Sequence, residues 1–237
     1  MAGSALLIGA AVGYLAPVPR HVVSAIMGFG AGVLLSAVSF ELIAEADERG
    51  GLRPTVIGAV TGAVVYTACN IVLAMNGARH RKRSGDQQPS ESEDAGSGTA
   101  IALGALLDGI PESIVIGASL LGGGAVGAVT VAAVFISNVP EGLSSAAGMR
   151  RAGRSSRYVF GLWTAIAVVS GLAAVAGYTL LGDASDGVLA GVTAVAAGAI
   201  LAMVADTMIP EAFEDAHLLI GLVTVAGFLV AFALSHA

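Results

Sequence analysis

Apolar residues run along this chain in long stretches that short polar segments interrupt. Most stretches are about as long as the roughly 20 residues with which an α-helix crosses a lipid bilayer. The bilayer core offers no water to backbone polar groups, so such stretches are expected to be helical. The pattern predicts eight spans, at about 2–18, 21–45, 54–76, 98–121, 124–148, 157–182, 186–209 and 216–236.

Turn-forming residues separate the predicted spans. Pro17 and Pro19 follow the first span, and Gly122–Gly124 separate the fourth from the fifth, which predicts a tight hairpin. The one long polar stretch, 77–97, is rich in Ser, Gly and charged residues and is predicted to be a flexible loop. Residues 1–237 are therefore expected to form one all-α domain, a polytopic membrane helix bundle with this loop in its middle.

The composition supports a membrane protein. Hydrophobic residues make up 56% of the chain and charged residues 12%, about half the usual charged share of a soluble domain. The single cysteine, Cys69, excludes an intrachain disulfide and a cage of cysteine ligands. The charges form no general basic surface, so we expect a lipid bilayer and no nucleic acid as partner.

The basic residues predict the orientation in the membrane. Nine of the 11 Lys and Arg residues fall on one side of the predicted topology, and the positive-inside rule places that side in the cytoplasm. The loop at 77–97 is then cytoplasmic and both termini lie outside. A multi-pass protein of the plasma or inner membrane is expected. The nine residues are Arg20, Arg79, Arg81, Lys82, Arg83, Arg150, Arg151, Arg154 and Arg157.

Seven acidic residues fall within the predicted spans or at their edges, whereas no Lys or Arg lies inside a span. We therefore expect these carboxylates to have no basic partner in the bilayer. An unpaired buried carboxylate is costly, so each one must hold a proton or meet a cation. The seven residues are Glu41, Glu45, Asp108, Glu112, Glu141, Asp206 and Glu211.

Two neighbouring spans repeat one pattern of oxygen-bearing residues. Asp108 precedes Glu112 by four residues, and Ser137 and Asn138 precede Glu141 by about one turn. Residues three or four apart share one face of a helix, so each span presents a polar stripe. The tight hairpin makes the two spans antiparallel neighbours. We therefore expect the stripes to face each other and to form a metal site from these five residues.

A proline directly precedes the glutamate of each stripe. Pro111 and Pro140 are expected to kink their helices and to free the carbonyls of Leu107 and Ile136. Freed carbonyls at membrane depth are tolerated where they line a polar cavity. All these groups are oxygen ligands, which suit Mn, Fe(II) and Mg and are also accepted by Zn.

Acidic residues in two other spans are candidate ligands at the entrance and exit of a pathway. Asp206 lies one turn before Pro210 and Glu211, near the predicted cytoplasmic end of its span. Glu41 and Glu45 are four residues apart near the outer face, where they could attract cations.

The chain resembles the ZIP (Zrt-, Irt-like) family of divalent metal transporters over most of its length. The resemblance rests on Asp108–Ser113 and Ser137–Gly142, which are similar to the family's paired motifs of the form His-Asn-x-Pro-Glu-Gly. It implies metal binding by Glu112 and Glu141, with Asn138 as a further ligand. Asp108 stands where the family usually has His.

Three differences from the family pattern bear on the number of metal ions. Ser137 stands where His or Gln is common, Gly109 replaces the usual Asn, and Ala174 falls where many members have a Glu in span six. We therefore expect one principal metal ion.

The resemblance implies that the protein imports Zn-, Fe- or Mn-type ions by alternating access, and no prosthetic group is expected. A proton-coupled carrier of a small organic cation is the main alternative, because the same carboxylates could serve as counter-ions. An intramembrane enzyme is a weaker one, because Asp108 lacks the Gly-x-Gly-Asp context of aspartyl proteases and no His lies inside a span to act as base. We therefore expect no enzyme, and formation of a homodimer stays open.

Overall fold

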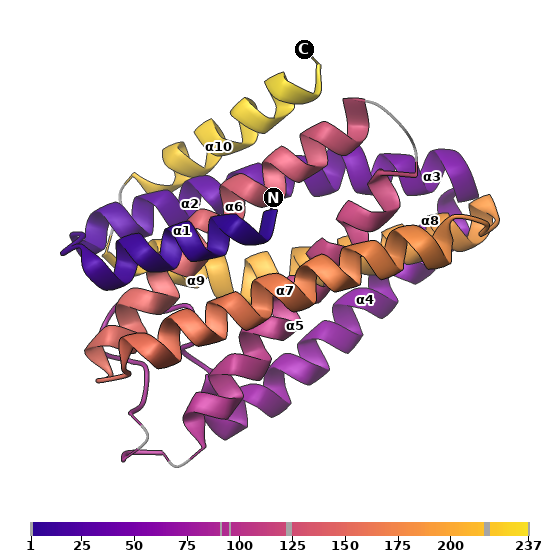
Figure 1. The fold of residues 1–237 in the computed structure, drawn as a ribbon. Helices are drawn as coiled ribbons and strands as arrows, with labels where there is room; N and C mark the ends of the chain where they lie inside the picture. The colour runs from indigo at the N-terminus through magenta and orange to yellow at the C-terminus, as the bar shows by residue number, and fades with distance from the viewer. Residues whose placement is uncertain (1, 91, 95, 122–124, 216–218, 237) are drawn as a thin grey trace.

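The computed structural model describes residues 2–90, 92–94, 96–121, 125–215 and 219–236. Within these ranges the chain consists of helices and the loops that join them, so the all-α prediction is confirmed (Figure 1). The helices are α1 (Ala2–Leu15), α2 (Arg20–Ala37), α3 (Ala44–Gly50), α4 (Leu52–Leu73), α5 (Ser97–Ser119), α6 (Ala125–Arg151), α7 (Ser156–Leu181), α8 (Asp186–Met203), α9 (Ile209–Asp215) and α10 (Ile220–Ser235).

Three π-helical turns occur in the described ranges. The turns η1 (Val38–Ile43), between α2 and α3, and η3 (Val204–Met208), between α8 and α9, continue their helices without a break. The turn η2 (Ala74–Ala78) follows α4 and departs from helical geometry at Asn76 and Gly77. A π-turn holds an extra residue and is frequent at functional sites. Glu41 lies in η1 and Asp206 in η3.

Among the described residues, five helical runs are long and apolar enough to cross a membrane, namely Arg20–Gly50, Leu52–Ala78, Ser97–Ser119, Ser156–Leu181 and Asp186–Glu214. Gly3–Leu15 and Ile220–Ser235 are shorter apolar helices. On α4 and α7, large apolar side chains such as Val64 and Leu172 are exposed, as on helices that face lipid. A membrane protein is therefore supported, and eight spans with both termini outside stay a prediction.

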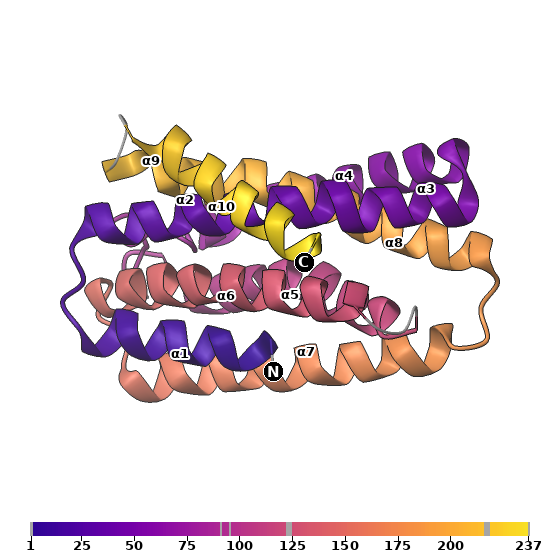
Figure 2. The same cartoon turned by 90° about the horizontal axis from the view of Figure 1, so that it is seen from above.

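The helices form two groups that lie side by side (Figure 2). In one group α1 packs on α6 and α7, and α5 packs on α7. In the other α2 packs on α10, and α4 packs on α8. Helices α5 and α6 lie on the side of their group that faces α8 and α2, so their polar stripes are in the interior of the bundle.

Glycines allow the closest helix contacts in the second group. A Cβ atom added at Gly32 of α2 would collide with the carbonyl oxygen of Thr224 in α10. A Cβ atom at Gly198 of α8 would collide in the same way with the carbonyl oxygen of Ala59 in α4. Small residues at such crossings are typical of membrane helices, whose backbones approach closely.

Candidate cation-binding site

The residues expected to bind metal on α5 and α6 are all buried. Asp108, Glu112 and Glu141 are at most 3% exposed, and Ser137 and Asn138 are buried beside them on α6. Helices α5 and α6 continue through Pro111 and Pro140, so each stripe lies within one helix. The prediction that these carboxylates lie in the interior is confirmed.

The surroundings of the carboxylates differ from the expectation. Lys82 Nζ lies 3.2 Å from Glu141 Oε2 and 3.4 Å from Asp108 Oδ2. Arg81 Nη2 lies 2.8 Å from Asp108 Oδ1, and Arg81 Nε donates to Asp108 Oδ2 at 2.9 Å. The expectation that no basic side chain would meet these acids is therefore wrong.

The two cations come from outside the spans. Arg81 and Lys82 belong to the basic segment, residues 79–90, which follows η2 and leads toward α5. This segment is part of the loop expected to be flexible, and it folds back so that Arg81 and Lys82 are 2% and 3% exposed. Buried charges of one sign demand partners of the other sign, and the partners here come from the connecting segment.

Arg81 joins the two groups of helices. Its guanidinium donates two hydrogen bonds to Asp108 of α5. It also donates to Asn70 Oδ1 of α4 at 2.8 Å and lies 2.9 Å from the hydroxyl oxygen of Tyr66 of α4. The Tyr66 hydroxyl in turn donates to Asp108. Burial disfavours the charged guanidinium, but the adjacent Asp108 carboxylate outweighs this and holds the pKa of Arg81 above its ordinary value. Arg81 is therefore a fixed cation.

Glu211 anchors the basic segment at a second place. Its Oε1 accepts from the Ser84 backbone N–H at 2.8 Å and lies 2.8 Å from the Ser144 hydroxyl of α6. Arg83 Nη1 lies 3.6 Å from Glu211 Oε2, forms a shorter pair with Glu214 and donates to the Pro210 carbonyl at 2.8 Å.

The other two candidate entrance and exit ligands differ from Glu211, which is buried. Asp206 is exposed and Glu41 is partly exposed. The structure therefore brings Glu211, but neither Asp206 nor Glu41, into the buried polar region that contains the basic segment.

The amide of Gln88 holds the backbone of the basic segment. Gln88 Nε2 lies 3.0 Å from the Arg81 carbonyl oxygen, 2.9 Å from that of Arg83 and 3.1 Å from that of Ser145 on α6. The Ser144 hydroxyl also contacts the Lys82 carbonyl oxygen. The docked segment is thus tied to α6 through its main chain as well as through its charges.

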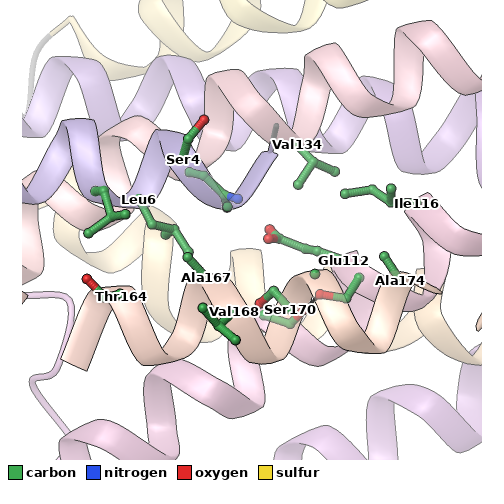
Figure 3. A pocket seen from close by; sticks show the side chains of 16 residues that line it. Ser4, Leu6, Glu112, Ile116, Val134, Thr164, Ala167, Val168, Ser170 and Ala174 are labelled. Atoms are coloured by element: carbon green, nitrogen blue, oxygen red, sulfur yellow. Dashed lines mark hydrogen bonds between the residues drawn. The ribbon is translucent and has the colours of Figure 1, made fainter. Parts of the chain in front are cut away.

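Glu112 faces a different environment from Asp108 and Glu141. It lines a cavity of about 300 Å³ between α1, α5, α6 and α7, together with Ser4, Asn138 and Ser170. Figure 3 shows its carboxylate in this space, with Ser170 and Ala174 of α7 nearby. Glu112 Oε1 is buried and accepts no hydrogen bond from the residues that the structure describes. It is the carboxylate that is open to a further cationic or hydrogen-bonding partner.

Two positions that depart from the family pattern line the same cavity. Gly109 and Ala174 both border the space that Glu112 enters. Neither residue carries a side-chain oxygen atom that could serve as a ligand there. The expectation of one principal metal ion stays a prediction.

The carboxylates do not converge on one point in this conformation. Within the described part of the chain, no group of three His, Cys, Asp or Glu side chains lies close enough to hold a metal ion. The Lys82 ammonium lies between Asp108 and Glu141, and Glu112 reaches into the cavity. Ser137 donates its hydroxyl to the Val134 carbonyl at 3.0 Å, so its hydrogen is engaged within α6.

Comparison of the sequence with models of known families and with curated proteins gives no match. The resemblance to ZIP transporters therefore rests on the two Pro-Glu motifs and the pattern of helices.

Sequence reasoning missed Tyr66, Arg81, Lys82 and Ser144 as partners of the acids. The available signal was the run of basic residues that directly follows the third predicted span.

Proposed function

We propose that this protein is a membrane transporter of divalent metal ions, with its carrier site between α5 and α6. The observation that carries the proposal is the Lys82 ammonium, a buried cation shared by Asp108 and Glu141. Carboxylates on two neighbouring helices thus hold one cation between them, which supports a cation-binding site at this place. Glu112, in the adjacent cavity, would supply a further ligand.

The charges of the site favour a cation with more than one charge. Three carboxylates, of Asp108, Glu112 and Glu141, lie near two basic groups, of Arg81 and Lys82. One negative charge is left over with both basic groups in place, and two are left over once Lys82 withdraws. A divalent ion would balance those two charges, whereas an unbalanced buried charge is costly.

The donor set indicates the class of metal ion. Carboxylates and the Asn138 amide are oxygen ligands, which serve Mn²⁺ and Fe²⁺ and are also accepted by Zn²⁺. Ser137 would have to turn from the Val134 carbonyl to reach a metal ion. One metal ion, held by Asp108, Glu112, Asn138 and Glu141, is the simplest occupancy.

Transport would follow alternating access in a bundle of eight spans with both termini outside the cell. Substrate sites near the bilayer midplane, between helices that can rearrange, are typical of secondary transporters. The resemblance to the ZIP family supports uptake across the cell membrane into the cytoplasm. Glu211, at the buried end of α8–α9 beside the basic segment, would be a ligand on the exit side.

A small organic cation is the second candidate substrate. The observation that favours it is the ammonium group of Lys82, which is itself an organic cation bound by the same carboxylates. The cavity beside Glu112 has room for a few non-hydrogen atoms. Direct uptake separates the candidates, since radiolabelled methylamine would enter cells that express a carrier of organic cations and would not enter through a carrier of metal ions.

Metal uptake in cells that express the protein tests the proposal. We expect uptake of Mn²⁺, Fe²⁺ or Zn²⁺ above that of cells without the protein, and its loss in Glu112→Ala and Glu141→Ala at equal amounts in the membrane. Glu48→Ala is the matched control, because Glu48 is an exposed acid at the end of α3. Normal uptake in both site variants would refute the proposal.

A further inference from the structure

Lys82 places an ammonium group where the proposed substrate would bind. Its Nζ lies within 3.4 Å of Asp108 and Glu141, two of the four proposed ligands, and the side chain is buried. A metal ion bound by the same carboxylates would lie within a few ångströms of this ammonium. Like charges repel strongly at that distance in a buried site. Lys82 and a metal ion therefore exclude each other.

The contacts of Lys82 are those of a replaceable occupant. Among the carboxylate oxygens of the described residues, its Nζ lies at hydrogen-bond distance from one only, Glu141 Oε2 at 3.2 Å, and lies 3.4 Å from Asp108 Oδ2. Arg81 differs, since its planar fork donates two bonds to Asp108 and is also held by α4. A lysine side chain is also long and flexible, which allows its ammonium to leave the carboxylates.

The backbone of Lys82 connects this occupancy to the docking of the basic segment. The Lys82 carbonyl oxygen accepts from Ser144 of α6, and two residues later the Ser84 N–H donates to Glu211 of α9. A shift of Lys82 would disturb both contacts. The occupant of the site thereby influences how firmly residues 79–90 close the end of the bundle on the predicted cytoplasmic side.

We propose that Lys82 is a tethered competitor of the transported cation, which occupies the site at rest and is displaced by a divalent metal ion, thereby loosening the basic segment. This rests on the proposed function, because the competition has meaning only if Asp108 and Glu141 bind the substrate. Lys82 then prevents the site from standing empty with unpaired carboxylates. It also lowers the apparent affinity for metal, which equals the intrinsic affinity multiplied by the fraction of time that Lys82 leaves the site free.

Equilibrium binding of Mn²⁺ to the purified full-length protein in mild detergent tests the competition. Free Mn²⁺ is measured by electron paramagnetic resonance. Lys82→Met removes the ammonium and keeps much of the side-chain volume, and we expect it to raise the affinity at least ~10-fold. Arg79→Met is the matched control, since Arg79 is an exposed basic residue of the same segment, and it should bind as the unaltered protein does.

Glu141→Gln makes the outcomes distinguishable, because it removes a proposed ligand. Unchanged affinity in Lys82→Met, combined with loss of binding in Glu141→Gln, would overturn the competition and leave the proposed function standing. No Mn²⁺ binding in either the unaltered protein or Lys82→Met would overturn the proposed function itself. A gain in Lys82→Met alone, with loss in Glu141→Gln, supports both.

A second measurement keeps Lys82 in place and so does not depend on how Lys82→Met folds. Cys69 is replaced by Ser, and the buried Ser84 by Cys, to give one thiol in the docked segment. We expect slow reaction with a maleimide without metal and a several-fold faster reaction with Mn²⁺, which is a poor partner for thiols. The same slow rate with and without Mn²⁺, at a concentration that saturates the site, would overturn the displacement of the segment.

Discussion

The ammonium nitrogen of Lys82 lies 3.2 Å from a carboxylate oxygen of Glu141, in the interior of the helix bundle. The two residues come from different parts of the chain, since Lys82 lies in the segment after η2 and Glu141 lies in the middle of α6. Their pairing shows that the polar stripe of α6 accepts a cation. It also shows that a connecting segment can supply a charge to the core of the bundle.

Asp108→Asn is expected to destabilise the protein, because it leaves the buried guanidinium of Arg81 without its carboxylate partner. Breaking a buried ion pair from one side costs about 3–5 kcal/mol, which corresponds to a fall of roughly 10 °C in Tm for a chain of this size. Thermal unfolding in detergent measures the change.

Two further variants make the Asp108 experiment specific. Asp206→Asn is the control, because Asp206 is exposed, and its Tm should stay within about 1 °C of the original. Adding Arg81→Met to Asp108→Asn removes the stranded charge and should recover part of the loss. Equal effects of Asp108→Asn and Asp206→Asn would contradict the pairing.

Gly32→Ala and Gly198→Ala are expected to push helices apart, because each added Cβ atom meets a backbone carbonyl oxygen that cannot turn away. Such overpacking costs about 1–3 kcal/mol, even though Ala favours a helix more than Gly does. We expect a lower Tm and less folded protein on size-exclusion chromatography. Gly191→Ala is the control on α8, where no atom lies within 4 Å of the added Cβ. A loss in Gly191→Ala as large as in Gly198→Ala would argue against this close contact.

The topology predicts that Asp86 and Asp183 lie on opposite sides of the membrane. Asp86 is in the basic segment, and Asp183 is in the exposed turn between α7 and α8. In a Cys69→Ser background, Asp86→Cys should react with a membrane-impermeant maleimide only from the cytoplasmic side. Asp183→Cys should react only from outside. Labelling of both from one side would refute the eight-span topology.

The sequence was sufficient to predict the helices and the acids in the interior. Long apolar runs permit little besides helix in a bilayer, and Asp108, Glu112 and Glu141 stand out against them. It was not sufficient to predict that Lys82 is buried, because a charged residue in a polar loop is usually exposed to solvent. The partners of Lys82 depend on how that loop folds back. The same limit applied to Tyr66, whose hydroxyl meets Asp108 only through the packing of α4 near α5.

For the acids at the ends of the spans, the sequence did not show which ones would be buried and which exposed. Glu41 and Asp206 lie in π-turns and Glu211 lies shortly after one, yet of these three only Glu211 is buried and bonded to the basic segment. That difference comes from Ser84 and Ser144, which lie far from Glu211 in the sequence.

Metal binding by the purified protein, with Glu112 as the variable, tests the central claim most directly. Glu112 makes no ion pair among the described residues that its loss would break, so Glu112→Gln removes a ligand without stranding a cation. Equilibrium dialysis with Zn²⁺ and Mn²⁺, followed by mass spectrometry of the bound metal, should find about one ion per chain. We expect at least ~10-fold weaker binding in Glu112→Gln and unchanged binding in Glu48→Gln. Equal binding in the two variants, or no bound metal in the unaltered protein, would contradict the account.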